Sequence, residues 1–353
     1  MVVDATDAGA CTCASTNACC DGCHVKADGK KCTPSSGVWG TCSGGTCTAV
    51  PGSIVEWTVG SGTGLGILAL SVGAKNRLAV ATGDTTTLQG NVALLDSATG
   101  QAHWTQADYA ETIALLPADA TLLVVGTTPA KLLALADGVT QVTLDGAAGP
   151  VAASPDGKSV AAASPTQIRL YTPGGAFVQA LDHAETAKAR HRALAYAPDA
   201  SRLASATGQN GLGSPHGEVK VFALANPTEA ATVQCTSMGL QFSPDGKRLL
   251  TACWNTLALW DVATGKQLAA GFEKDDVLTV AWSPDGAWLA AGTLTGGVKL
   301  YDAATYTGDV TKPTLRLPVS HVTALAFSPD SQQLYVGTGS KPSVFVWSLP
   351  SAK

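Results

Sequence analysis

Short apolar segments and polar turn sequences alternate along the chain from about residue 53 to its end. Three examples are "MGLQFSPDGKRLLTAC", "LTVAWSPDGAWLAAGT" and "VTALAFSPDSQQLYVGT". In each, a short apolar segment leads into a turn sequence, and a second apolar run of strand length follows. Short apolar runs bounded by turn residues are typical of strands, so the pattern predicts an all-β protein built from hairpins.

A Ser-Pro-Asp-Gly sequence or a variant of it separates the two strands of each hairpin. Proline at the second position and glycine at the fourth suit a type I turn. The turn prolines are Pro117, Pro155, Pro198, Pro244, Pro284 and Pro329, and Val72 stands at this place in the first copy. The copies recur about every 40 residues, which is the period of a β-propeller with four strands per blade. The copies therefore predict a seven-bladed β-propeller.

The fifth copy shows how each repeat divides into strands. We expect strands at Met238–Ser243, Leu249–Cys253 and Thr256–Asp261, followed by a fourth in "QLAAGF". The last copy supplies only three strands and ends in "SVFVWSLPSAK". The segment Ser53–Val59 is a spare strand ahead of the first copy, and we expect it to be the outer strand of the last blade. This pairing would close the ring and cover an open sheet edge.

The third strand of several copies ends in an aromatic or apolar residue followed by aspartate. These pairs are Trp260-Asp261, Tyr301-Asp302 and Leu95-Asp96, and Trp347 ends the last copy. Together with the recurring "FSPDG" turn, they make residues 53–350 similar to the WD-repeat propeller family. The resemblance implies a rigid ring of blades that binds partners through its loops.

The resemblance is incomplete at two positions of the repeat. The Gly-His pair that precedes the first strand in that family is missing, and so is the aspartate of the turn between the second and third strands. His191 and His321 lie near the place of that histidine but have no glycine before them. The resemblance therefore implies the fold, but blades without the family's buried His–Asp hydrogen bonds.

Charge and hydropathy argue against a nucleic-acid partner and against a membrane-spanning segment. The formal net charge is −5, which gives no general attraction to phosphate backbones, so we expect no nucleic-acid partner. The sequence has no apolar run of the length that spans a bilayer, so we expect no membrane-spanning segment. Only 14% of residues are charged and 38 are glycine, as suits short strands joined by tight turns.

Most cysteines lie near the N-terminus, in a segment with very few aliphatic residues. They are Cys11, Cys13, Cys19, Cys20, Cys23, Cys32, Cys42 and Cys47. Such a segment cannot bury a core, so cross-links must order it. We predict a flexible N-terminus at residues 1–10 and a disulfide-rich module at residues 11–47. Its cysteine spacing is weakly similar to disintegrin-like modules, and no function follows from that.

The same segment also fits a second chemistry. Cys20, Cys23 and His24 form the C-x-x-C-H pattern by which c-type haem is attached. A haem needs an apolar pocket and a second axial ligand, and this segment is too poor in aliphatic residues to build the pocket. We therefore expect disulfides and no cofactor, with haem, or zinc bound by the thiols, as alternatives.

This use of cysteine indicates an oxidising compartment. The opening "MVVDATDAGACTC" lacks the features of a signal peptide, so we expect a mature or trimmed form of an exported protein. The expected location is secreted, periplasmic or at the cell surface. Cys235 and Cys253 lie at the same end of one predicted hairpin, where they form a disulfide or stand as two small buried apolar residues.

The predicted channel has little chemistry. The innermost strand segments contain no internal histidine, carboxylate, lysine or arginine. The six histidines are scattered, at His24, His103, His183, His191, His216 and His321. We therefore expect no catalytic residues, no metal site and no enzyme, with a hydrolase or lyase as the alternative.

Function then moves to the loops. In each blade, the turn between the second and third strands and the connection from the fourth strand to the next blade open on one face, here called the loop face. The candidate contacts on it are Trp254, Asn255, Tyr109, Lys188, Arg190 and Arg192. An exposed aromatic beside a cationic loop would suit an acidic protein, a glycan or a second copy of the chain. The alternatives are an inward-folded Trp254 and a solvated basic loop. We expect an exported scaffold, with an extracellular haem electron carrier as the first alternative.

Overall fold

A computed structural model describes residues 31–32, 40–43, 46–49, 54–59, 64–117, 121–125, 129–183, 190–208, 217–226, 228–272, 275–295, 297–307, 315–316 and 321–349. Every regular element in these ranges is a β-strand. Within the same ranges, no helix has the length and apolar character needed to cross a membrane. The predicted all-β fold is confirmed.

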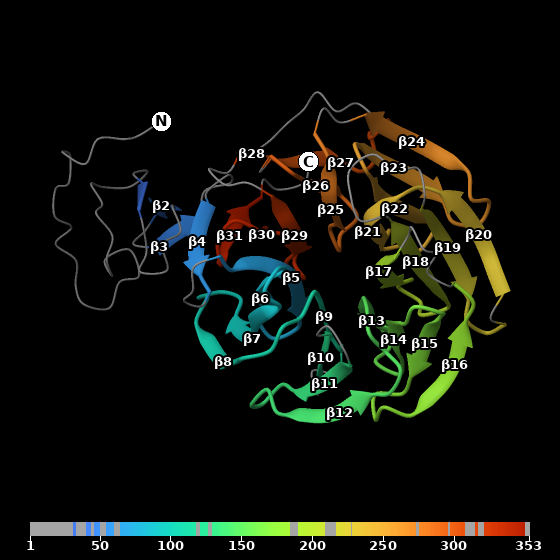
Figure 1. The fold of residues 1–353 in the computed structure, drawn as a ribbon. Helices are drawn as coiled ribbons and strands as arrows, with labels where there is room; N and C mark the ends of the chain where they lie inside the picture. Colours follow the sequence, from blue (N-terminus) through green and yellow to red (C-terminus); the bar gives the residue numbers. More distant parts are fainter. Residues whose placement is uncertain are drawn as a thin grey trace.

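The described strands form four-stranded antiparallel sheets arranged as a ring (Figure 1). The first four sheets in chain order are β5 (Gly66–Gly73), β6 (Arg77–Asp84), β7 (Gln89–Asp96) and β8 (Ala102–Gln106); β9 (Thr112–Leu115), β10 (Thr121–Val125), β11 (Ala130–Ala134) and β12 (Thr140–Leu144); β13 (Val151–Ala153), β14 (Val160–Ala163), β15 (Ile168–Tyr171) and β16 (Phe177–Leu181); and β17 (Arg190–Tyr196), β18 (Arg202–Gly208), β19 (Glu218–Ala223) and β20 (Thr228–Gln234).

Three further sheets complete the ring. They are β21 (Ser237–Phe242), β22 (Arg248–Cys253), β23 (Thr256–Asp261) and β24 (Gln267–Phe272); β25 (Val277–Trp282), β26 (Trp288–Thr293), β27 (Gly297–Asp302) and β28 (Leu315–Arg316); and β29 (Val322–Phe327), β30 (Gln333–Thr338), β31 (Ser343–Ser348) and β4 (Ile54–Thr58). The first strand of each sheet faces the centre of the ring (Figure 1). The architecture is therefore a β-propeller, as the repeat predicted.

The ring is closed by strands from opposite ends of the sequence. β4 is the outer strand of the last sheet and pairs with β31, from Trp347 opposite Ile54 to Ser343 opposite Thr58. In Figure 1 the blue β4 lies beside the red β31. The prediction that Ser53–Val59 closes the ring is confirmed, and the pairing gives the last sheet its fourth strand.

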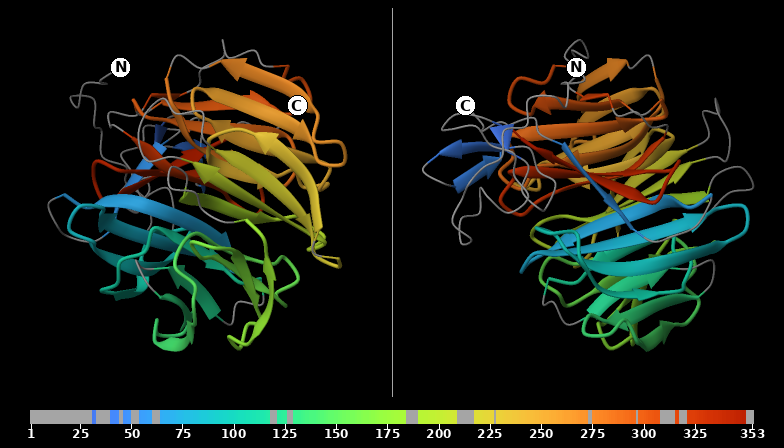
Figure 2. Two further views of the ribbon diagram at one scale, coloured as in Figure 1. Left: turned by 45° about the vertical axis from the view of Figure 1, so that its right-hand side comes forward. Right: turned by 90° about the vertical axis from the view of Figure 1, so that its left-hand side faces the viewer.

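A small antiparallel sheet stands outside the ring, in blue in the right-hand view of Figure 2. Its strands are β1 (Lys31–Cys32), β2 (Gly40–Ser43) and β3 (Thr46–Ala49). Cys42 is opposite Cys47 in the register of β2 and β3. The side chains of this sheet, and the whole of residues 1–30 with five of the eight predicted disulfide cysteines, lie outside the described residues.

The predicted turns are built around a serine and an aspartate. In the turn between β21 and β22, the amide of Arg248 donates to Ser243 Oγ at 2.9 Å, and the amide of Lys247 donates to Asp245 Oδ1 at 3.1 Å. Gly246 has a φ of +69°, a left-handed conformation that glycine adopts without strain. The four strands of this sheet lie within one residue of their predicted bounds.

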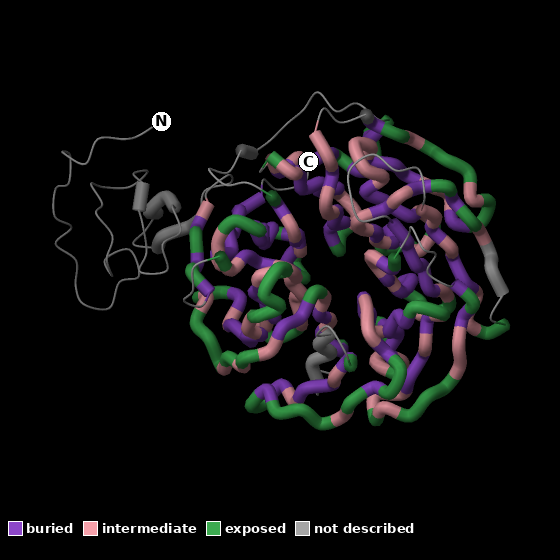
Figure 3. The backbone as a smooth tube through the Cα atoms, viewed as in Figure 1, coloured by how far each residue is buried: buried purple, intermediate pink, exposed green. Residues whose placement is uncertain are grey.

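Two kinds of contact hold neighbouring sheets together: apolar clusters between the middle strands and hydrogen bonds between the innermost strands. Apolar clusters join the middle strands, for example Leu257 and Leu259 with Trp282 and Leu289. Figure 3 shows these buried positions in purple and the more exposed outer strands largely in green and pink. Burying a leucine or tryptophan side chain contributes roughly 1.5–3 kcal/mol, so the repeated inter-sheet clusters are the main source of stability.

Polar side chains of the innermost strands also join neighbouring sheets. Gln241 Oε1 accepts a hydrogen bond from the amide of Trp282 at 2.8 Å. The amide of Leu115 donates to Ser71 Oγ at 3.0 Å, and Thr323 donates to the carbonyl of Ile67. Gln241, Ser71 and Thr323 therefore join the backbone of neighbouring sheets.

Candidate interaction face

The loop face carries Trp254 and Asn255 in the turn between β22 and β23, where the sequence predicted them. Both side chains are partly buried. Trp254 has a φ of 57°, which is rare for a bulky residue. Its carbonyl accepts a hydrogen bond of 2.8 Å from the amide of Val277, the first residue of the next sheet. The turn is therefore tied to a neighbouring sheet while part of the indole stays open to solvent.

Tyr109 does not behave as predicted. Its side chain is only 6% exposed, and its hydroxyl donates to Glu111 Oε1 at 3.1 Å. The ring packs against Gly83, where a Cβ would come within 3.0 Å of it. Burial and the nearby Glu111 carboxylate raise the pKa of the hydroxyl. The prediction of an exposed aromatic anchor at Tyr109 is wrong, because the absence of a side chain on Gly83 leaves room for the ring.

The predicted basic loop is only partly within the described residues. Lys188 lies outside them, whereas Arg190 and Arg192 belong to β17. Arg190 is exposed. Arg192 is partly buried, and its aliphatic stem packs close to Gly208, where a Cβ would lie 3.3 Å from Cγ. Of these two arginines, Arg190 is the better placed to meet a partner.

Two histidines that looked scattered in the sequence lie together: His191 in β17, and His183 two residues after the end of β16. The rings of His183 and His191 are 5.2 Å apart, and both are buried. Ser205 Oγ lies 3.0 Å from His183 Nδ1 and 3.4 Å from His191 Nδ1. The sequence pattern did not indicate this cluster, because β17 begins at Arg190 and so includes a histidine and two arginines ahead of its apolar segment. The prediction that the innermost strands hold no such residues is therefore wrong for β17.

This histidine cluster contains a serine and two imidazoles that are buried, and a carboxylate, that of Glu218, that is partly exposed. His183 Nε2 lies 3.5 Å from Glu218 Oε1, and Lys220 Nζ lies 3.5 Å from the same oxygen. Burial, then the charges of His191 and Lys220, lower the pKa of His183 to about 3. Ser205 is completely buried, so its hydroxyl cannot reach a substrate in this conformation. The cluster therefore links His183, which follows β16, to strands β17, β18 and β19.

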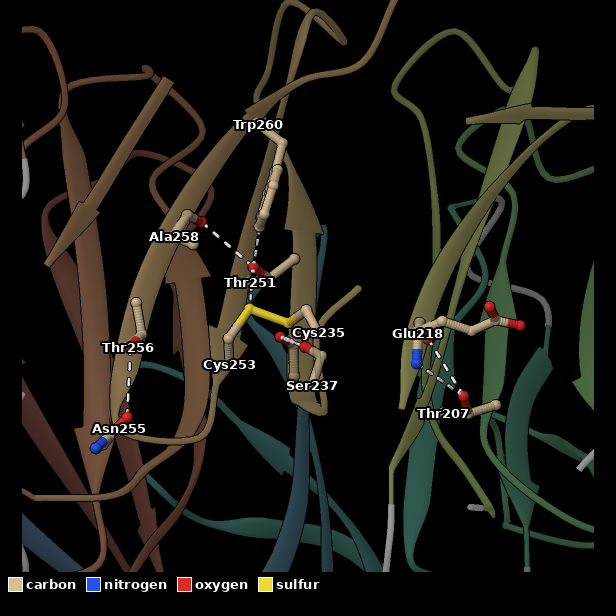
Figure 4. The surroundings of a disulfide bond; sticks show 11 residues. Thr207, Glu218, Cys235, Ser237, Thr251, Cys253, Asn255, Thr256, Ala258 and Trp260 are labelled. Carbon is tan, nitrogen blue, oxygen red and sulfur yellow. Dashed lines mark hydrogen bonds between the residues drawn. A yellow bond between two sulfur atoms is a disulfide. The ribbon is translucent and has the colours of Figure 1, made fainter. Parts of the chain in front are cut away.

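A disulfide joins Cys235 and Cys253, with their Cα atoms 5.4 Å apart (Figure 4). Cys235 lies in the connection from β20 to β21, and Cys253 ends β22, so both halves lie at the loop face. The bridge that the sequence left open is therefore present. Next to it, Trp260 Nε1 donates to Thr251 Oγ1 at 2.8 Å, and Thr251 Oγ1 lies 3.0 Å from Cys253 Sγ.

The part of the chain that the structure describes holds no group of three or more histidine, cysteine or acidic side chains placed to bind a metal ion. The alternative haem ligands Cys20, Cys23 and His24 lie outside that part. The chemistry on the described loop face is therefore that of an aromatic ring, an amide and a cation, which suits contact with another molecule.

Comparison with known proteins agrees with this architecture. Residues 228–261, 265–302 and 312–348 match the family profile "WD domain, G-beta repeat". Each matched repeat begins by the outermost strand of one sheet and ends at the third strand of the next. The sequence repeat thus starts one strand earlier than the sheet. For the same reason the last sheet takes its fourth strand, β4, from the start of the propeller sequence.

Two curated relatives share parts of the chain. Periodic tryptophan protein 2 of Arabidopsis thaliana is 44% identical over 66 residues, which are 18% of this chain and 7% of the relative. Protein groucho of Drosophila melanogaster is 29% identical over 161 residues, which are 45% of this chain and 20% of the relative. The chain thus matches only a small part of the length of either relative. The three matched repeats show that residues 228–348 consist of WD repeats, and the recurring strand pattern and the closed ring of sheets make the rest of the propeller similar to the same family.

Proposed function

We propose that this chain is a non-enzymatic scaffold that binds a protein partner through its loop face. The observation that carries the proposal is the Trp254 turn. A bulky aromatic residue is held in a left-handed conformation, partly exposed, and tied to the next sheet through Val277. Strained backbone of this kind persists only where the surroundings hold it, and it is common at binding sites.

The inner strands support binding rather than catalysis. Gln241, Ser71 and Thr323 use their polar groups to join neighbouring sheets. Ser205, the hydroxyl nearest to an imidazole, is buried beneath the surface. These contacts make the ring a rigid platform, and rigid platforms commonly present their binding residues on loops.

An acidic protein surface is the partner that the exposed groups favour. The indole of Trp254 offers apolar area, and the exposed Arg190 offers a cation that pairs with carboxylates. A glycan or a second copy of the chain would use the same aromatic ring. The experiment below distinguishes them by the chemistry of what is captured.

We further propose that the protein works in an oxidising compartment, either secreted, periplasmic or at the cell surface. The disulfide between Cys235 and Cys253 supports this, because such bridges persist where thiols are not kept reduced. A mass measurement of the denatured chain before and after reduction tests the whole set of ten cysteines. One hydrogen pair lost per bridge without an adduct agrees with a disulfide module. A haem-sized adduct would instead establish the electron-carrier alternative.

Site-specific cross-linking tests the binding face. A photo-reactive amino acid replaces Asn255 in one variant and Phe177, 51% exposed on the outer strand β16, in the control. We expect a discrete protein adduct from position 255 in extracts of the source cells or their medium, and none from position 177. Equal capture at both positions, or none at position 255, would contradict a contact at this face.

A further inference from the structure

We propose that the loop face is completed by oxidation: the Cys235–Cys253 disulfide is a redox-sensitive latch that fixes the turn of Trp254 and Asn255. The inference concerns regulation of the proposed binding site and so rests on the function proposed above. It begins with the position of the bridge. The two cysteines join a connection between sheets to the end of β22, one residue before Trp254 (Figure 4).

The bridge lies where the strand pairing is interrupted. Leu240 is opposite Thr251, but the next pair toward the loop face is Ser237 opposite Cys253. Two residues of β21 therefore face one residue of β22, which is a β-bulge. Bulges locally weaken the ladder, so the disulfide holds the hairpin together at the end where backbone hydrogen bonds hold it least.

The neighbouring sheets contain the same bulge without a disulfide. In β25 and β26, Val277 is opposite Thr293 and Thr279 is opposite Gly292. Thr293 of that sheet takes the place of Cys253, so Thr295 takes the place of Asn255. The backbone amide and the hydroxyl of Thr295 both donate hydrogen bonds to the Asp275 carboxylate. The β22–β23 turn instead carries the disulfide and the left-handed Trp254. The bridge is thus the distinctive restraint on the turn that carries the candidate contact.

The surroundings allow the bridge to open without unfolding the sheet. Cys235 is 7% exposed and Cys253 is only partly buried, so Cys253 is the more accessible half of the bridge. Thr251 Oγ1 lies beside Cys253 Sγ and would remain a polar neighbour for the free thiol. The hydrogen bond from Trp260 to Thr251 lies on the core side of the bridge. Reduction therefore releases the turn while the inner part of the sheet keeps its contacts.

The chemistry is an ordinary thiol–disulfide exchange. A dithiol reductant transfers two electrons and two protons: the S–S bond of the protein breaks, each cysteine becomes a thiol, and the reductant closes to a cyclic disulfide. In the oxidising direction, transfer of electrons from the two thiols to an oxidised dithiol restores the bridge. The turn would then adopt its fixed form only after the chain meets an oxidant, as an exported protein does.

Amide hydrogen exchange on the full chain tests the latch without a partner. The samples are the wild type and the double variant C235S/C253S, each with and without dithiothreitol. In the reduced wild type and in the variant, we expect exchange of residues 254–259 and of the Val277 amide to rise about tenfold or more, because local opening becomes easier. Residues 333–348, in the last sheet, should not change.

The variant also serves as the control for the other cysteines. Dithiothreitol acts on the N-terminal cysteines of both proteins, so the latch accounts only for a rise that dithiothreitol causes in the wild type and does not cause in the variant. Unchanged exchange at the turn on reduction, or a rise across every sheet, would overturn the proposal. Because no partner is present, this failure is separate from a failure of the proposed binding function, which the cross-linking experiment measures.

Discussion

The indole of Trp57 lies directly on Gly100: a Cβ built on that glycine would come within 2.5 Å of the ring. Trp57 belongs to β4, the outer strand of the last sheet, whereas Gly100 lies in the turn between β7 and β8 of the first. Trp104 in β8 lies in the same way on Gly138, in the turn between β11 and β12. An aromatic residue of one outer strand thus packs on the turn glycine of the next sheet, and at Gly100 this contact closes the ring.

Replacing Gly100 with alanine should therefore destabilise the propeller strongly. Its φ of +74° strains any other residue, and the new methyl group would collide with the Trp57 ring. Together these effects should lower the free energy of unfolding by roughly 2–5 kcal/mol in denaturant titrations.

Two glycines separate the two effects. Gly246 has a φ of +69° but its nearest neighbour would be 3.6 Å from a new Cβ, so G246A should cost only about 1 kcal/mol. Gly174 has an ordinary φ and a nearest neighbour at 3.7 Å, so G174A should change stability by less than about 0.5 kcal/mol. Similar losses in all three variants would show that the ring contact is unimportant.

Ala200 offers the opposite substitution. It has a φ of 56° at the turn position where Gly157, Gly246 and Gly286 stand in other sheets. Ala200→Gly should raise the free energy of unfolding by about 0.5–1 kcal/mol, because relief of strain outweighs the added flexibility of the unfolded chain. The control A180G, in strand β16, should destabilise instead. A loss of stability in Ala200→Gly would show that the left-handed backbone carries no strain there.

The sequence predicted the parts of the fold that depend on local chemistry. The Ser-Pro-Asp-Gly turns and the closing strand follow from residues that interact with near neighbours or with a fixed strand pattern. The two cysteines that could form a disulfide, Cys235 and Cys253, could be identified because both lie at one end of a predicted hairpin.

The sequence could not predict two kinds of contact. One kind depends on the space beside a glycine that has no side chain, and the other depends on the residue at which a strand begins. Tyr109 is buried because Gly83 has no side chain, a detail of packing between distant positions. His183 and His191 meet because β17 begins before its apolar segment, so that His191 lies in the strand, and Ser205 of β18 lies against both rings. One sequence feature could have indicated this pair: His183 and His191 stand at the two ends of a basic segment just before the apolar part of β17.

Ser243 should couple the turn between β21 and β22 to pH. Hydrogen bonds from Ser243 and from the amide of Lys247 lower the pKa of Asp245 below its ordinary value of 3.8. Since the folded pKa is the lower one, the carboxylate contributes stability above its unfolded pKa and loses it as the pH falls through the folded pKa. Ser243→Ala should cost about 1 kcal/mol at pH 7 and make unfolding less dependent on pH below 4.

Ala197 shows that this turn tolerates the change. It occupies the position of Ser243 in the sheet of β17–β20, where Asp199 binds Ser201 instead. The variant should therefore fold, and denaturant titrations at pH 7 and pH 3 can be compared with the wild type. An unchanged pH dependence would mean that Ser243 does not hold the Asp245 carboxylate.

His183 should make the protein less stable in mild acid. Burial, His191 and Lys220 lower its pKa to about 3, from an ordinary 6.5. The groups around it are His191, Ser205, Glu218, Lys220 and Phe222. Below pH 6.5 the unfolded chain takes up a proton that the folded chain does not. The free energy of unfolding therefore decreases as the pH is lowered. At about 1.4 kcal/mol per unit, the loss from pH 6.5 to pH 5 is about 2 kcal/mol.

The variant His183→Gln removes this titration and should lose less stability than the wild type over the same interval. Unfolding by urea at both pH values gives the difference directly. The variant is expected to be less stable than the wild type at pH 7, because a buried ring is lost, so the comparison is between slopes. Parallel curves would show that another group controls the acid sensitivity.

The most direct test of the central claim is the affinity of the cross-linked partner for two variants. Trp254→Asn removes the indole while keeping a residue that tolerates the left-handed backbone at φ 57°. Phe177→Ala removes a more exposed aromatic, 51% exposed on the outer strand β16, that lies away from the loop face. We predict that Trp254→Asn weakens binding at least about tenfold, as loss of a tryptophan anchor does, and that Phe177→Ala leaves it unchanged. Equal affinity of Trp254→Asn and the wild type would contradict the assignment of the loop face as the binding surface.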